Sequence, residues 1–205
     1  MSEPNQIEQA VEQLRAGGVI AMPTDTVYGL AAALDQPAAI ERIYELKGRD
    51  YAKPLPVLVG SIAHARRLVR DLTPLAAAVA ERAWPGELTI VVAASDEVPA
   101  SVIRGGDSVG LRMPNQPLAL AIIEAAGGAL AVTSANRSGE PEARSAAEVR
   151  SMFGSELAYI ADGGEIAGGT PSTVVRIERD RLEVLRQGDV DIEALRGELG
   201  VEPWR

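Results

Sequence analysis

The chain has 205 residues, of which 46% are hydrophobic and 3% aromatic, and its formal net charge at pH 7 is −9. This length suits one domain with an aliphatic core, and the acidic balance argues against broad nucleic-acid binding, which depends on basic surface. Cysteine is absent and histidine occurs once, which excludes disulfides, thiolate chemistry and a multi-histidine metal site.

Hydrophobic periodicity and turn residues divide the chain into helices and strands. Ile7, Val11 and Leu14 recur at helical spacing, and the pair Gly17-Gly18 ends that helix. The predicted helices cover residues 4–16, 37–46, 61–69, 73–82, 117–126 and 145–152, with a polar helix in the C-terminal tail. The predicted strands cover residues 19–22, 55–59, 88–92, 109–111, 130–133, 159–161, 173–177 and 182–185.

Helices and strands alternate along the chain without a strict βαβ order, and the last three predicted strands follow one another with no predicted helix between them. The order predicts an α/β fold with a mixed twisted sheet flanked by helices. No internal repeat or low-complexity linker divides the sequence, so we expect a single domain over residues 1–205. No apolar run is long enough to span a membrane and no signal-peptide pattern is present, which predicts a cytoplasmic protein.

The common signatures of nucleotide binding and hydrolysis are missing from the sequence. It contains no G-x-x-x-x-G-K-[ST] loop, no G-x-G-x-x-G turn that opens a helix and no G-x-S-x-G elbow. A single histidine also argues against a Ser-His-Asp triad. Catalysis would therefore depend on Lys, Arg, Asp, Ser, Thr and Asn, which suit anion binding and alignment, as in phosphoryl and nucleotidyl transfer.

The only two lysines of the chain, Lys47 and Lys53, flank Arg49 in a short polar segment. Every other basic residue except the single histidine is arginine, whose planar fork differs from the compact charge of lysine. Three cations within this segment of an acidic chain point to a site that holds an anion. A solvated loop with accidental clustering is the alternative.

Polar side chains follow several predicted strands, at the positions where open α/β sheets build their sites. They are Thr24, Asp25, Thr26, Arg112, Ser134, Asn136, Ser172 and Thr173. Each has a structural alternative, namely a turn or helix cap for the small residues and a weak surface ion pair for Arg112. Gly163-Gly164 and Gly168-Gly169 are expected to form turns. Only the joint occurrence of these groups favours a functional site.

Several short segments, taken together and in order, resemble the YrdC-like family of threonylcarbamoyl-AMP synthases. They are Pro23–Leu30, Lys47–Arg49 with Lys53–Leu55, Trp84–Gly86 with Leu88-Thr89, Gly110–Pro114, Thr133–Asn136 with Ser138-Gly139, Pro171–Val175 and Leu185–Gly188. The resemblance covers about residues 7–190, so the chain resembles the short single-domain form of the family.

The resemblance implies a fold with a large concave, positively charged cleft. It implies synthesis of L-threonylcarbamoyl-AMP and pyrophosphate from ATP, L-threonine and bicarbonate. Mg²⁺ would bridge the phosphates of ATP, held largely by substrate and water rather than by protein ligands. Separate downstream proteins would transfer the threonylcarbamoyl group to tRNA.

The resemblance also assigns roles to individual positions. Lys47 and Arg49 would be catalytic, because they would stabilise the negative charge that grows on the phosphates. The expected ATP-binding residues are Arg49, Lys53, Ser108, Asn136, Arg144 and Arg186. The expected L-threonine-binding residues are Thr26, Arg112, Ser134 and Ser172, and the fork of Arg112 would clamp the threonine carboxylate.

Two other functions stay open at this point. The same cleft could belong to an RNA-binding module that recognises phosphates, although the acidic net charge and the lack of an aromatic stacking surface weigh against it. Weak direct binding of tRNA or RNA by a synthase also stays open. A domain of this fold could also transfer a carbamoyl group from another carboxylated substrate.

Overall fold

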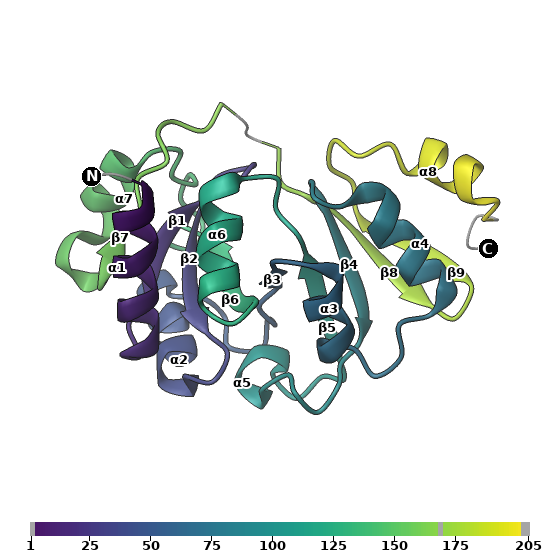
Figure 1. Cartoon of the computed structure of the whole chain (residues 1–205), viewed down its shortest axis with the longest axis horizontal. Coiled ribbons are helices and arrows are strands. Elements are labelled where there is room, and N and C mark those ends of the chain that lie inside the picture. The colour runs from purple at the N-terminus through teal and green to yellow at the C-terminus, as the bar shows by residue number, and fades with distance from the viewer. Residues whose placement is uncertain (1–2, 168–169, 202–205) are drawn as a thin grey trace.

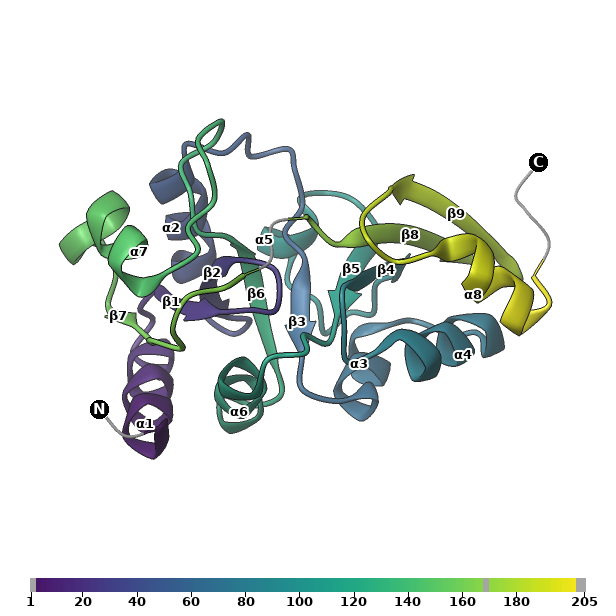
Figure 2. The ribbon, with the colours of Figure 1, turned by 90° about the horizontal axis from the view of Figure 1, so that it is seen from above.

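We describe the protein from a computed structural model that covers residues 3–167 and 170–201. Within these residues, a nine-stranded sheet runs along the long axis of the molecule and helices pack on it (Figure 1). The expected turn at Gly168-Gly169 lies outside the described residues. The strands β8 and β9 and the helix α8 lie at the opposite end of the sheet from α1 and α7 (Figure 2).

The sheet is mixed, with strand order β7-β1-β2-β6-β3-β5-β4-β8-β9. The pairs β1/β7, β3/β5 and β4/β8 are parallel, and the other pairs are antiparallel. The strands are β1 (Ile20–Pro23), β2 (Tyr28–Ala33), β3 (Val57–Val59), β4 (Leu88–Ala93), β5 (Ser108–Arg112), β6 (Ala129–Ser134), β7 (Tyr159–Ile160), β8 (Thr173–Glu178) and β9 (Arg181–Arg186). This arrangement confirms the predicted α/β class with a mixed sheet.

The helices begin at capping residues that the sequence supplies. Ser61, Thr73, Ser145 and Asp191 each accept a hydrogen bond from a backbone N–H of the first turn that follows. The helices are α1 (Glu3–Arg15), α2 (Pro37–Lys47), α3 (Ile62–Leu68), α4 (Pro74–Ala83), α5 (Ala100–Ile103), α6 (Pro117–Ala125), α7 (Ala146–Phe153) and α8 (Ile192–Leu199), with a 3₁₀ turn at Gly154–Glu156.

Alternate residues of the strands point into two hydrophobic clusters on opposite faces of the sheet. On β2, Leu30 and Ala32 join the larger cluster, whereas Ala31 and Ala33 join the smaller one. The smaller cluster is completed by α1 and α6, which lie side by side in Figure 1. The larger cluster receives α2, α3, α4, α5, α7 and α8.

The sequence patterns predict every strand except β2, and they also miss the four-residue helix α5. The β2 sequence, Tyr-Gly-Leu-Ala-Ala-Ala, has no polar alternation because all six residues are buried. It also lacks the β-branched residues that mark strands. The structure therefore corrects the prediction by inserting a fully buried strand between the hydroxyl-rich turn and α2.

On the face that carries the smaller cluster, helices cover the half of the sheet with β1 and β2 but leave the half with β4 more exposed. α6 contacts β1, β3 and β6 there, which covers the half of the sheet that contains β1 and β2. Along β4 in the other half, Thr89 is buried, Val91 is half-buried and Ala93 is exposed on this same face. A site can therefore form where the helical cover ends and the strand ends remain accessible.

Candidate active site

A cavity of about 330 Å³, the central cavity, opens at this boundary between the two halves of the sheet. Its volume lies within the range of sites for small molecules. Six residues that the sequence predicted as site residues line it: Thr26, Arg49, Arg112, Ser134, Ser172 and Arg186. These residues are far apart in the chain, so the fold brings them together.

The register of the strands explains why these side chains meet. Leu58 of β3 pairs with Arg112, the last residue of the parallel strand β5. Gly29 of β2 pairs with Ser134, the last residue of β6. A Cβ atom at Gly29 would lie 2.7 Å from a side-chain carbon of Val132, so the close packing of β2 on β6 at the cavity requires glycine.

The guanidinium of Arg112 is buried and held on three sides. Its Nε donates to the carbonyl of Gly86 at 2.9 Å, and its Nη1 donates to the hydroxyl of Thr26 at 3.3 Å. Its Nη2 forms an ion pair with Asp25, in which the two side chains are only 8% and 11% exposed. Arg112 is therefore part of a buried network, and the alternative of a weak surface ion pair is wrong.

The turn before β2 supplies the partners of Arg112. The Thr24 hydroxyl donates to the carbonyl of Val27 at 2.6 Å and accepts from the amide of Thr26 at 3.2 Å, which closes the turn. The second carboxylate oxygen of Asp25 accepts from the backbone amide of Asn115 at 3.0 Å. Thr24 thus closes the turn and does not cap a helix, as the alternative for this residue had it, while Asp25 ties the turn to the end of β5.

A second arginine orders another part of the cavity lining. Arg186, at the end of β9, donates through Nε and Nη2 to the carbonyl of Ser172 at 3.0 and 2.8 Å. The Ser172 hydroxyl lies 2.9 Å from the hydroxyl of Thr89 on β4. Burial is the main cause that lowers the pKa of Arg186, and the nearby carboxylate of Glu142 opposes it.

Lys47, which the sequence predicts as catalytic, lies beneath the cavity and is not among the residues that line it. Its Nζ donates to the carbonyls of Ser134 and Asn136 at 2.6 and 2.8 Å and to the Asn136 side-chain oxygen at 2.8 Å. Three acceptors engage all the donors of an ammonium group. Lys47 therefore positions the segment after β6 in this structure.

The environment of Lys47 changes its acidity. Burial, and then the positive charge of Arg49, lowers the pKa of Lys47 to about 8, while the carboxylate of Glu142 opposes the change. This ammonium group therefore titrates close to physiological pH, unlike an ordinary lysine.

The loop that carries Arg49 is shaped by the end of α2. Gly48 has φ +58° and its backbone N–H bonds back to the carbonyls of Glu45 and Tyr44, which terminates the helix and turns Arg49 into the cavity. Arg49 donates through Nη2 to the carbonyl of Pro54 at 3.1 Å, but none of the described residues offers a hydrogen-bond partner to its buried Nε. Arg49 thus retains donor capacity for a ligand.

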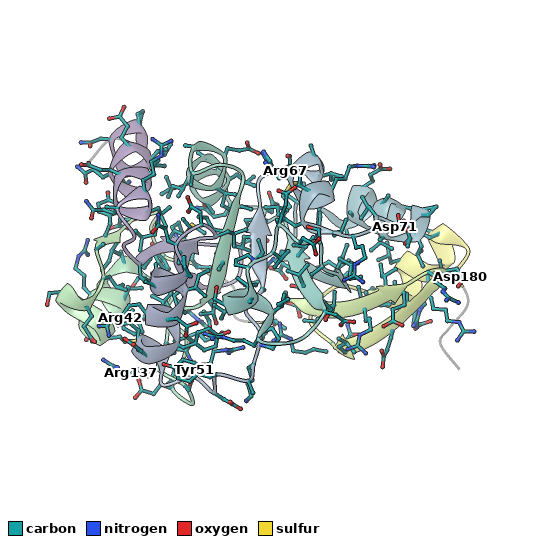
Figure 3. The ribbon with its side chains drawn as sticks, turned by 90° about the horizontal axis from the view of Figure 1, so that it is seen from below. Arg42, Tyr51, Arg67, Asp71, Arg137 and Asp180 are labelled. Carbon is teal, nitrogen blue, oxygen red and sulfur yellow. The ribbon has the colours of Figure 1, made fainter. Side chains whose placement is uncertain are left out.

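Aromatic stacking holds the same loop from outside. The rings of Tyr44 and Tyr51 stack with centroids 5.2 Å apart, and the guanidinium of Arg104 lies 3.9 Å from the Tyr44 ring centre. Tyr51 lies on the surface beside α2 (Figure 3). The backbone carbonyl of Lys53 accepts from the Tyr44 hydroxyl at 2.9 Å, whereas the Lys53 side chain is exposed and does not line the central cavity.

A larger hollow of about 920 Å³, the adjoining groove, continues from the central cavity. Val27 and Glu142 line both, and the predicted residues Asn136 and Arg144 line the groove. The Asn136 amide nitrogen donates to the carbonyl of Glu140 at 2.8 Å, which fixes the loop that forms the wall of the groove.

Ser108 does not join the other predicted residues. It is the first residue of β5 and Arg112 is the last, so about 13 Å of strand separates them. Ser108 lines a different hollow, together with Asp71 and Arg176. Its placement gives no support to the predicted contact with ATP.

Thr89 and Glu142 are among the residues that line the central cavity without a role assigned from the sequence. Thr89 was part of a quoted motif but had no assigned role, and its contact with Ser172 depends on the pairing of β4 with β8. Glu142 lies in a polar loop that gives no sequence signal. Its place in the cavity depends on backbone hydrogen bonds that join the neighbouring residue Ala143 to Tyr28 of β2 and to Ala135 after β6.

Two features are absent from residues 3–167 and 170–201. In this part of the chain, no group of three or more His, Asp or Glu side chains is arranged to hold a metal ion. No helix there combines the length and apolar character needed to cross a membrane.

The fold and the cavity define an α/β protein with a concave, arginine-lined cavity whose charge suits a small anionic ligand. Comparison with known sequences gives a match between residues 12–188 and the family model for Sua5, YciO and YrdC, described as "Telomere recombination". The match covers most of the chain, and the protein belongs to the Sua5/YciO/YrdC family.

Individual relatives are consistent with this assignment. The chain is 39% identical over 194 residues to the threonylcarbamoyl-AMP synthase of Pyrococcus abyssi, covering 93% of this chain and 57% of that protein. It is 41% identical over 156 residues to the threonylcarbamoyl-AMP synthase of Alkalilimnicola ehrlichii, covering 76% of this chain and 81% of that protein. The chain therefore spans little more than half of the P. abyssi relative.

A solved structure shows the same fold. The crystal structure of P. abyssi Sua5 complexed with L-threonine superposes with a TM-score of 0.92 at 35% identity, covering 99% of this chain and 59% of that chain.

Proposed function

We propose that this chain forms L-threonylcarbamoyl-AMP and pyrophosphate from ATP, L-threonine and bicarbonate. Relatives that carry the name threonylcarbamoyl-AMP synthase support the proposal. The observation that carries it is the central cavity, where Arg49, Arg112 and Arg186 together line a single space of about 330 Å³. Such a space suits two anionic substrates whose reactive ends must meet.

The side of the cavity that contains Arg112 suits the amino acid. A guanidinium has five N–H donors, and protein acceptors engage three of those of Arg112. Two donors are left for the threonine carboxylate, in the geometry that arginine provides. The hydroxyls of Thr26, Ser134 and Ser172 line the same cavity and would hydrogen-bond the polar groups of threonine.

The other side suits the polyphosphate of ATP. Arg49 and Arg186 line the cavity, and the buried Arg49 Nε has no partner among residues 3–167 and 170–201. Asn136 and Arg144 in the adjoining groove would bind the rest of the nucleotide. Lys47 would act indirectly, by holding Ser134 and Asn136 and by adding positive potential beneath the cavity.

In the proposed reaction, the threonine amine is first carboxylated to a carbamate. A new N–C bond forms to the carbon of bicarbonate, a C–O bond of bicarbonate breaks, and the lost oxygen leaves as water together with a proton from the amine. A carbamate oxygen then attacks the α-phosphorus of ATP, a new P–O bond forms, and the bond to the bridging oxygen breaks with its electron pair leaving on pyrophosphate. Arg49 and Arg186 would stabilise the charge on the phosphates as the leaving group departs. Mg²⁺, bound with ATP, would neutralise part of that charge, and the Glu142 carboxylate is a chemically suitable oxygen ligand in the cavity.

Pyrophosphate release tests the proposal directly. We expect release only when ATP, L-threonine and bicarbonate are all present, and a purified, folded protein without this joint requirement would contradict the proposal. Replacing bicarbonate by carbamoyl phosphate tests transfer from another carboxylated substrate. A salt titration of tRNA binding tests the RNA-binding alternative, for which tight binding with a steep salt dependence is expected.

As part of this proposal, residues 1–205 form one domain, and transfer of the threonylcarbamoyl group to tRNA is carried out by other proteins. A coupled assay checks the second point. This chain alone should leave tRNA unmodified, and adding the transfer proteins should yield the modified tRNA.

A further inference from the structure

Glu142 introduces negative charge into a cavity otherwise built for anions. Its side chain lines both the central cavity and the adjoining groove, at the boundary between them. Of the described residues that line the central cavity, Glu142 alone carries a carboxylate, whereas Arg49, Arg112 and Arg186 are cationic. An acidic group in this position opposes a polyphosphate unless a cation lies between them.

The carboxylate of Glu142 has no structural role that would explain its position. Among the described residues, no hydrogen bond and no ion pair within 4.0 Å engages it. The backbone fixes this part of the loop, because the amide of Ala143 donates to the carbonyl of Ala135 at 3.0 Å and the carbonyl of Ala143 accepts from the amide of Tyr28 at 2.9 Å. Ala143 itself is fully buried. The side chain of Glu142 is therefore available to a ligand.

Glu142 is electrostatically coupled to the cations on the polyphosphate side. Its charge raises the pKa of Lys47 and of Arg186, against the lowering that burial causes in both. In contrast, Arg112 has its own carboxylate partner in Asp25. The negative charge of Glu142 thus acts where the phosphates of a nucleotide would lie.

We propose that Glu142 is a protein ligand of the divalent cation that accompanies the polyphosphate, and that it makes nucleotide binding depend on that cation. The inference rests on the proposed function, because it assumes that a nucleotide polyphosphate occupies this side of the cavity. Mg²⁺ takes oxygen ligands, keeps several waters, and in nucleotide sites is commonly bound by one or two carboxylates together with substrate phosphates. A single carboxylate beside the phosphates meets this requirement without a protein cage.

The amino group of threonine is a weaker candidate for the partner of Glu142. In the proposed reaction this amine becomes an anionic carbamate, which an adjacent carboxylate would repel. A divalent cation, in contrast, stays positive throughout and attracts both the carboxylate and the phosphates. The two partners predict different consequences for the same substitution.

The test is a titration of ATP into the protein by calorimetry, with Mg²⁺ and with excess chelator, in the absence of threonine. For the unaltered chain we expect Mg²⁺ to increase ATP affinity roughly tenfold, a typical size for coupling between two ligands. For Glu142→Gln we expect metal-free ATP to bind more tightly than to the unaltered chain, and the Mg²⁺ effect to fall to about twofold or less.

Glu140→Gln is the matched control. Glu140 is exposed on the same loop and lines the groove but not the central cavity, so this variant removes the same charge nearby. It should keep the full Mg²⁺ effect. Thermal unfolding of both variants verifies that the loop substitutions leave the fold intact.

The outcomes separate this inference from the proposed function. An equal Mg²⁺ effect in the unaltered chain and in Glu142→Gln overturns the role of Glu142 and leaves the proposed function standing. A Glu142→Gln protein that loses threonine affinity and keeps the Mg²⁺ effect assigns the carboxylate to the amino group, which also overturns the inference. An unaltered chain that binds no ATP with or without Mg²⁺ contradicts the proposed function itself.

Discussion

Arg112 and Arg49 line the same cavity, but the protein holds their guanidinium groups in different ways. Arg112 is fixed by Gly86, Thr26 and Asp25, and its charge is balanced within the protein. Within the described part of the chain, the Arg49 side chain makes one hydrogen bond, to the carbonyl of Pro54, and its buried Nε has no partner.

The difference shows how one cavity can treat two anionic ligands differently. The Arg112 side is organised before any ligand binds, so a carboxylate meets donors that are already oriented. The Arg49 side carries unbalanced charges on Arg49, Arg186 and Glu142, which a polyphosphate and its cation would balance. Selectivity for the amino acid would therefore come from geometry, and affinity for the nucleotide largely from charge.

The largest expected effect is on the preorganised side. Arg112→Ala should lower the rate of pyrophosphate release by more than about 100-fold, because charge-assisted contacts to the substrate are lost. It should also lower the free energy of unfolding by about 3 kcal/mol, because it leaves the Asp25 carboxylate buried without its partner. Steady-state kinetics and urea unfolding measure the two effects.

Arg112→Lys keeps the positive charge beside Asp25 and loses the planar fork. It should recover most of the stability and little of the activity. Full activity in Arg112→Lys would show that charge alone matters on this side and would remove the contrast with Arg49.

The next effect is a dependence of activity and stability on pH through Lys47, whose pKa is lowered to about 8. Above pH 8 the folded protein loses this proton, so the bonds to Ser134 and Asn136 weaken and the rate of pyrophosphate release should fall. An unfolded chain keeps the proton up to the ordinary value of 10.5, so the unfolded state binds more protons between these two pH values. The contribution of Lys47 to the free energy of unfolding should therefore rise with pH, by at most about 3 kcal/mol.

Activity and stability are thus expected to change in opposite directions above pH 8. A pH–rate profile of the unaltered protein gives the first quantity, and the difference in unfolding free energy between it and Lys47→Met gives the second. A rate profile that is flat from pH 7 to 10 would contradict the positioning role of Lys47.

A smaller effect is expected from the aromatic stack that supports the Arg49 loop. Tyr51→Ala removes the stack on Tyr44, which is worth about 0.5–1.5 kcal/mol, and should raise KM for ATP several-fold. KM for threonine should stay the same, because Arg112 is held independently. Tyr51→Phe keeps the stacked ring and serves as the control, and an equal rise in both KM values would mean that the two sides are not independent.

The smallest effect is expected at Ser108, which the sequence placed among the nucleotide ligands. Ser108→Ala should leave KM for ATP unchanged, because the residue lies at the far end of β5 from Arg112. A several-fold rise in KM for ATP would show that the nucleotide reaches beyond the central cavity and the adjoining groove.

The sequence by itself determined the elements that depend on local chemistry. Periodic apolar residues and capping side chains such as Ser61 and Thr73 fix where helices begin. These interactions join residues only a few positions apart in the chain. The segments around Arg112 and Ser134 were also recognisable as site candidates, because polar residues at predicted strand ends are visible without knowledge of the sheet order. Arg49 was recognisable because it lies between the only two lysines of the chain.

Only the tertiary structure decided which of these candidates share a space. Lys47 and Arg49 are two residues apart, yet Lys47 is buried under the cavity and Arg49 lines it, because α2 ends between them at Gly48. The strand β2 and the position of Glu142 depend on contacts between distant segments. Burial on both faces of a strand and the return of a loop to the sheet are long-range events, and they leave no periodic signal in the chain.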